Sequence, residues 1–148
     1  MNETNKNLRI ETDEFIFEAP EAYRIESLDD QAELVGPNFE LLLISSYSID
    51  KLSSTEEIED FKNNITTAML TAIDEPDLVV TTSLKQETTD DGLPVWSLLT
   101  EAIDKSHFFD QYAISNGSIV VVVTIEGDYE NKNSSASVEE SVYDIEFK

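Results

Sequence analysis

The second half of the chain carries four strand-like segments in succession, and this run constrains the fold more than any other feature. It consists of Leu78–Thr88, Pro94–Ile103, Phe108–Ser115 and Ser118–Glu126, separated by short polar turns. Each segment is rich in the β-branched, aromatic and aliphatic residues typical of strands. Successive strands with such short connections pair antiparallel. The sequence therefore predicts a four-stranded meander over residues 78–126.

The dipeptide Asn116-Gly117 lies between the last two segments and is a strong signal for a type I′ hairpin. If these two residues form the whole loop, Tyr112 faces Val121 across the hairpin. Both faces of this hairpin are largely apolar, and so is the segment Phe39–Ile49. Strands of this kind are usually covered on both sides. We therefore expect the sheet to be buried on each face.

Two capping boxes predict helices that could provide this cover. Ser54 with Glu57 opens the first helix, and Ser137 with Glu140 opens a short one near the C-terminus. The apolar stripe expected to pack the first helix on the sheet consists of Ile58, Phe61, Ile65 and Met69. The predicted fold is a single α+β domain over residues 1–148. It has one antiparallel sheet with a helix on each face, an α/β/α sandwich.

Acidic residues dominate the charge of the chain, with 32 Asp and Glu against 9 Lys and Arg and a net charge of −23. Such a surface repels phosphate backbones and anionic lipid headgroups, so we expect neither a nucleic-acid nor a membrane partner. The first residues lack the apolar core of a signal peptide, and no apolar run is long enough for a membrane span. These features predict a cytoplasmic protein.

No catalytic motif emerges from the sequence, so we expect a protein that is not an enzyme and uses no cofactor. The chain has no cysteine and one histidine, His107, which is better explained as a surface pair with a carboxylate across the hairpin than as a general base. The loop at Asp128 lacks the glycine and the terminal glutamate of an EF-hand. We therefore predict neither catalytic nor metal-binding residues.

The order of these elements resembles that of the PsbP-like sandwich family. The resemblance is carried by FIFEAPEAYRIES at residues 15–27, FELLLISSYSI at 39–49, the helix from Ser54, the meander, and VEESVYDIEF at 138–147. The family includes DcrB-like bacterial lipoproteins and the Eag adaptor chaperones of type VI secretion. What the resemblance implies is a PsbP-like fold and a binding role more often than catalysis.

Two functions are favoured over a third, a small enzyme or ligand carrier, which no motif supports. The first is an acidic inhibitor, such as an immunity protein that neutralises a basic bacterial toxin, because opposite charge accelerates association. The alternative is an adaptor that holds an apolar segment of a secreted effector in a groove. The residues predicted to contact a partner are Glu56, Glu59, Asp60, Asp90, Asp91, Asp128 and Glu130, together with Trp96, which is otherwise a core residue. The sequence predicts no oligomeric state.

Overall fold

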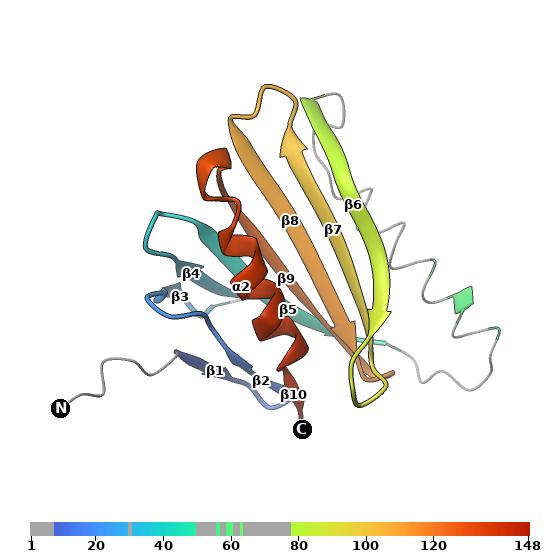
Figure 1. Cartoon of the computed structure of the whole chain (residues 1–148). Helices are drawn as coiled ribbons and strands as arrows, with labels where there is room; N and C mark the ends of the chain where they lie inside the picture. The colour runs from blue at the N-terminus through green and yellow to red at the C-terminus, as the bar shows by residue number, and fades with distance from the viewer. Residues whose placement is uncertain (1–7, 30, 50–55, 57–58, 61–62, 64–77) are drawn as a thin grey trace.

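The computed structural model describes residues 8–29, 31–49, 56, 59–60, 63 and 78–148. Figure 1 shows two antiparallel sheets and a helix that crosses one face of the larger sheet. The smaller sheet contains β1 (Arg9–Glu11), β2 (Phe15–Glu18) and β10 (Glu146–Phe147). The larger sheet contains β3 (Arg24–Ser27), β4 (Ala32–Val35), β5 (Leu41–Ser48), β6 (Val79–Thr88), β7 (Pro94–Ala102), β8 (His107–Ser115) and β9 (Ile119–Asp128).

The predicted meander over residues 78–126 is confirmed. The large sheet has the strand order β3-β4-β5-β9-β8-β7-β6, so the four meander strands are neighbours and β5 pairs with β9 in the middle of the sheet. Every pairing in it is antiparallel. In β5, Leu42 and Ile44 are buried on one face of the strand, while Leu41 and Leu43 on the other face are half-buried.

The hairpin between β8 and β9 turns one residue later than predicted. Asn116 N–H donates to the Ile119 carbonyl at 3.3 Å, which leaves Gly117 and Ser118 as the two central residues. Gly117 has φ +91° while Ser118 does not have a positive φ, the pattern of a type II′ turn. Tyr112 consequently faces Val123, not Val121. Each cross-strand partner thus changes by two positions. This keeps every side chain on its predicted face, since side chains alternate along a strand.

The expectation of a single sheet with a helix on each face is wrong. Strand β2 pairs with β1 on one edge and with β10 on the other, so its backbone hydrogen bonds are satisfied in a separate sheet. This small sheet covers part of the large sheet, because Phe15 and Phe17 belong to the same apolar core as Leu34 and Leu42. One face of the large sheet is therefore covered partly by a second sheet, where a helix alone was predicted.

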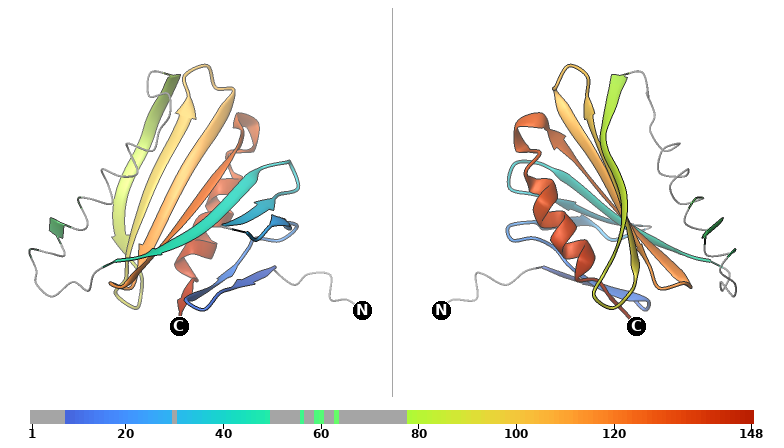
Figure 2. Two further views of the ribbon diagram at one scale, coloured as in Figure 1. Left: turned by 180° about the vertical axis from the view of Figure 1, so that it is seen from behind. Right: turned by 45° about the vertical axis from the view of Figure 1, so that its right-hand side comes forward.

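Helix α2 (Ser134–Tyr143) is the one α-helix with defined bounds among the described residues, and Figure 2 shows it packed on the same face as the small sheet. It begins at Ser134, three residues before the predicted cap Ser137, and its N-cap Asn133 makes no side-chain cap hydrogen bond. Val138 and Val142 are fully buried in the core that α2 shares with both sheets.

The first predicted helix can be compared only at four positions. These four residues have helical backbone and exposed side chains, as the polar face of the predicted helix requires: Glu56, Glu59, Asp60 and Asn63. The capping residue Ser54 and the apolar stripe Ile58, Phe61, Ile65 and Met69 lie outside the described residues. The opposite face of the large sheet carries its own small core of Trp96, Leu98, Ala113 and Val120.

Candidate functional site: an acidic groove beside helix α2

The acidic residues predicted to contact a partner do not form one cluster. Asp90 and Asp91 lie in the β6–β7 turn, whereas Asp128 is the last residue of β9 and Glu130 lies in the short helix directly after it. The strand register places these two groups at opposite ends of the sheet, because β7 begins beside Ile114 and ends beside Phe108. Glu56, Glu59 and Asp60 form a third, helical group. All seven side chains are exposed, but they belong to three separate groups.

Trp96 lies in the smaller core cluster and is only 1% exposed. Its position beside Leu98 and Ala113 is the core position that its apolar neighbours in the strand indicate. A partner could contact the indole only after it had first become exposed. The role of Trp96 in partner binding stays a prediction.

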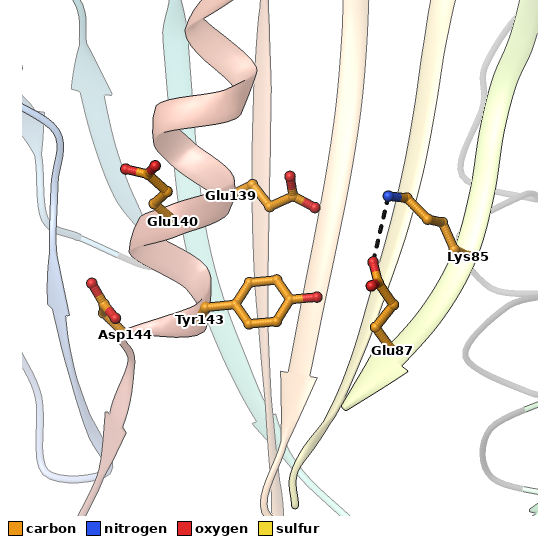
Figure 3. Close-up of a pocket in the computed structure, with 6 residues that line it drawn as sticks. All are labelled: Lys85, Glu87, Glu139, Glu140, Tyr143 and Asp144. Atoms are coloured by element: carbon orange, nitrogen blue, oxygen red, sulfur yellow. Dashed lines mark ion pairs between the residues drawn. The ribbon is translucent and has the colours of Figure 1, made fainter. Parts of the chain in front are cut away.

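A groove of about 580 Å³ runs between α2 and the edge strand β6. Figure 3 shows Glu139 and Tyr143 extending from α2 toward β6, while Glu140 and Asp144 extend to the other side of the helix. From β6, Lys85 and Glu87 complete the lining. They share one face of the strand because they are two positions apart. One turn of helix and one strand face thus build the groove.

Carboxylates determine the electrostatics of this groove. Four carboxylates and one ammonium line it, which gives −4 + 1 = −3. The ammonium of Lys85 lies 3.4 Å from Glu87 Oε1, and both side chains are half exposed, so this ion pair is weak. Burial raises the pKa of Tyr143, and the negative charges of Glu87 and Glu139 raise it further. The groove therefore favours cationic groups.

A second cavity of about 380 Å³ continues the groove toward the start of α2 and shares Glu139 with it. It lies between the first turns of α2 and the strands β6, β7 and β8. Its charged lining residues are Glu101, Asp110, Glu139 and Lys132. We call the two cavities together the α2 groove. Their charges show that the excess of carboxylates extends along the whole of it.

Asp110 is the most unusual residue of the α2 groove, because its carboxylate is only 5% exposed. Its Oδ1 accepts a hydrogen bond from the Thr100 backbone N–H at 3.1 Å, and the Ser135 hydroxyl is a further partner. Burial raises the pKa of Asp110 to about 6, and the nearby charges of Glu101 and Glu139 act in the same direction, while the two hydrogen bonds oppose the shift. A carboxyl group that changes charge near neutral pH is thus part of the groove wall.

A hydrogen bond between two hydroxyl groups fixes the helix above this carboxylate. Tyr112 Oη lies 2.5 Å from Ser135 Oγ, and both residues are buried. Since an ionised carboxylate only accepts hydrogen bonds, Ser135 donates to Asp110 and Tyr112 donates to Ser135. Three residues on β8 and α2 therefore form one polar chain between the sheet and the helix.

Asp110 and the acidic residues of α2 were not among the residues predicted from the sequence. A signal for Asp110 was present, since it stands two positions from both Phe108 and Tyr112 on the apolar face of its strand. A charged residue on a buried face is rare unless it has partners, so it marks a special environment. The α2 residues Glu139 and Glu140 carry no comparable signal, because acidic side chains on a helix are ordinarily solvent-exposed.

A third groove of about 560 Å³ separates the small sheet from β3, β4 and β5. Six of its lining residues are apolar: Ile10, Phe15, Ile25, Leu28, Ala32 and Ile44. Ile25 is 40% exposed and Leu28 is 57% exposed, so part of this lining is accessible to a partner. We call this the inter-sheet groove. It differs from the α2 groove in that six apolar residues stand beside its polar and charged ones.

Neither a metal centre nor a membrane helix is found in the part of the chain that the structure describes. No group of three or more His, Asp or Glu side chains is placed to hold a metal ion in those residues. None of the helices among the described residues combines the length and the apolar character needed to cross a bilayer.

Comparison with known proteins identifies the fold. No protein family matches the chain, and no curated protein matches its sequence. The solution structure of cyanobacterial PsbP (CyanoP) from Synechocystis sp. PCC 6803 is similar over 100% of this chain and 95% of that chain, with a TM-score of 0.67 and 10% sequence identity. At this identity the similarity concerns the fold alone. The PsbP-like fold predicted from the sequence is confirmed.

Proposed function

We propose that this chain is a non-enzymatic binding protein whose α2 groove receives basic side chains of a protein partner. The observation that carries the proposal is the lining of the groove, where Glu87 and Glu139 extend into the space beside a single lysine that is already paired, and Glu140 and Asp144 add negative charge from the same helix. Lysine and arginine side chains are the protein groups that carboxylates bind best. The net charge of −23 supports the same partner, because it attracts basic proteins over a long range.

The more specific form of this proposal is an immunity-type inhibitor that neutralises a basic bacterial toxin. An inhibitor must associate quickly with its target, and opposite charges raise association rates by orders of magnitude. Carboxylates in a groove can also occupy the cationic site at which a toxin binds its substrate. The acidic groups at Asp90, Asp91, Asp128 and Glu130 would steer the partner without contacting it.

The test is a titration of the protein with an octalysine peptide, in which binding is measured by isothermal calorimetry and by changes in backbone NMR chemical shifts. We expect the largest shifts at Glu87, Glu139 and Tyr143, and binding that weakens as salt is added. The double variant E87Q/E139Q should weaken binding more than the matched variant D90N/D91N, which removes the same charge in the β6–β7 turn. Equal losses of affinity for the two variants would show that net charge alone attracts the peptide, and would contradict the proposal that the peptide binds in the α2 groove.

The alternative function is an adaptor for an apolar segment, of the kind found in type VI secretion. The specific observation in its favour is the inter-sheet groove, where Ile25 and Leu28 are exposed among other apolar residues. An apolar segment bound there would gain roughly 25 cal/mol for each Å² of apolar surface removed from water. Its binding would depend little on salt.

The two functions can be separated with one pair of variants. An adaptor should lose affinity for an apolar peptide in the variant I25S/L28S and keep it in E87Q/E139Q. An inhibitor should show the reverse pattern toward its basic partner. Salt dependence provides a second readout, since only contacts between charges weaken as ionic strength rises.

A further inference from the structure

Two of the nine basic residues of the chain converge on one tyrosine at the end of the large sheet. Lys132 Nζ lies 2.9 Å from Tyr129 Oη and 4.3 Å from the ring centroid. Lys105 Nζ lies 3.5 Å from the same oxygen and 5.1 Å from the centroid. The backbone N–H of Tyr129 donates to the Ser106 carbonyl at 3.2 Å, which holds the short helix η3 (Tyr129–Asn131) against the β7–β8 turn. The arrangement is therefore fixed by both backbone and side chains.

Tyr129 differs from the other four tyrosines in its electrostatic environment. Burial raises the pKa of each of the others, namely Tyr23, Tyr47, Tyr112 and Tyr143. The hydrogen bonds from Lys132 and Lys105 lower the pKa of Tyr129. The phenolate is the nucleophilic form of a tyrosine, so stabilising it makes the oxygen more reactive.

We propose that Tyr129 is a nucleophilic tyrosine and the site at which this chain accepts a phosphoryl group. In the transfer, Tyr129 Oη attacks the γ-phosphorus of a nucleoside triphosphate that is held by a protein kinase. The new O–P bond forms as the bond to the departing nucleoside diphosphate breaks, and the phenol proton passes to the base of the kinase. This inference is independent of the α2 groove.

The two lysines favour a phosphoryl group over a neutral one. A phosphotyrosine carries about −1.5 to −2 charges at neutral pH and has three strong acceptor oxygens, which match two ammonium donors. An acyl ester at the same oxygen would be neutral and would leave both lysines without a partner at Tyr129. The carboxylate of Glu101 also contacts both ammonium groups, with Oε1 at 3.4 Å from Lys105 Nζ and Oε2 at 3.9 Å from Lys132 Nζ. The phosphoryl group would therefore share these cations with one carboxylate.

The surrounding charges also constrain the enzyme that would carry out the transfer. Asp128 and Glu130 flank Tyr129 in the chain and are both exposed. A kinase that binds this segment needs a basic substrate groove, because like charges across an interface are strongly unfavourable. The acidic flank thus restricts the modifying enzyme, while the lysines stabilise the product.

The first test measures the reactivity of the phenol with an aryl sulfonyl fluoride, which forms a sulfonate ester as fluoride leaves. Tyr47 is the matched control, because it is 44% exposed and its pKa is raised by burial with no lysine among the causes. We expect Tyr129 to be labelled first, and the variant K105M/K132M to react more slowly at Tyr129, because a smaller fraction of the phenol is ionised without the two lysines. Labelling of Tyr47 before Tyr129 would overturn the proposal.

The second test measures the product. Phosphotyrosine introduced genetically at position 129, and separately at position 47, is titrated by ³¹P NMR. We expect the phosphate at position 129 to titrate at lower pH than that at position 47, and the difference to disappear in K105M/K132M. Identical titrations at the two positions, or no effect of removing the lysines, would show that Lys105 and Lys132 do not hold the group and would contradict the proposal.

Discussion

The carboxylate of Glu40 accepts a hydrogen bond from the Ser134 hydroxyl at 2.5 Å, which joins the β4–β5 turn to the first residue of α2. The same carboxylate accepts the Asn38 backbone N–H at 2.7 Å, and the residue is only 1% exposed. Since Asn133 makes no side-chain cap hydrogen bond, Glu40 supplies the negative group at the positive end of the helix dipole from a turn that is distant in the sequence.

The variant E40A should therefore lower the free energy of unfolding by about 2 to 4 kcal/mol, because it removes two hydrogen bonds to a charged group and leaves a buried gap. Urea unfolding followed by circular dichroism measures the change. The matched control is E18A, an exposed glutamate on the small sheet, which should cost less than about 0.5 kcal/mol. If S134A lowers the free energy of unfolding as much as E40A does, the contact between Glu40 and Asn38 contributes nothing to stability.

Asp110 should make the protein more stable as the pH falls from 7.5 to 5. Its pKa is raised to about 6 in the folded state from an ordinary value of 3.8, so the folded state binds the proton more tightly than the unfolded state. The contribution is therefore complete below the unfolded pKa and is lost as the pH rises through the folded one, a difference of about 2 to 3 kcal/mol.

The variant D110N isolates this contribution, because asparagine keeps an acceptor for the Thr100 N–H and has no charge to lose. Thermal unfolding at pH 7.5 should show the variant to be more stable than the wild type, and the two should converge near pH 4. A wild type and a variant whose stabilities change in parallel over this range would show that other carboxylates cause the pH dependence.

Added salt should raise the stability at neutral pH. The chain has 23 more negative than positive charges, and ions screen the repulsion between them in the folded state. Melting temperatures measured between 10 and about 150 mM sodium chloride test this, because the Debye length falls to about 8 Å over that range. A melting temperature that does not change would show that the ion pairs already compensate the charge.

Phe39 should be a stabilising position for substitution by glycine. Its φ of 67° lies in the left-handed region, which costs a non-glycine residue about 1 kcal/mol, and its side chain is 82% exposed. F39G should therefore raise the free energy of unfolding by roughly 1 kcal/mol. F39A keeps the unfavourable φ while removing the aromatic ring, so it should show no such gain. Equal stabilities for the two variants would point to the exposed ring as the cause.

Local signals in the sequence were sufficient to predict the meander of the large sheet but not how all of the strands pair. The alternation of apolar residues and the turn residues identified the meander. The centre of the last hairpin lies one residue later than predicted, because Asn-Gly marks a turn without stating which residues lie at its centre. Pairing of β2 with β10 joins residues more than a hundred positions apart, and no local pattern records such a contact.

The candidate site was less predictable than the fold. The α2 groove depends on how far the helix lies from β6, which follows from tertiary packing and not from residue spacing. The acidic residues chosen from the sequence were those in exposed turns and on a polar helix face, and the charge of 32 acidic residues gave no means of ranking one group above another. Only Asp110 had a distinguishing position.

The small sheet also constrains the order in which this protein can fold while it is being synthesised. Strand β2 is synthesised before the meander and α2, but one of its two edges pairs with Glu146 and Phe147, which come after them. That edge must wait while the whole meander and α2 are made. During translation Phe15 and Phe17 lack part of their final surroundings, so this early segment depends on a nascent chain that has not yet been completed.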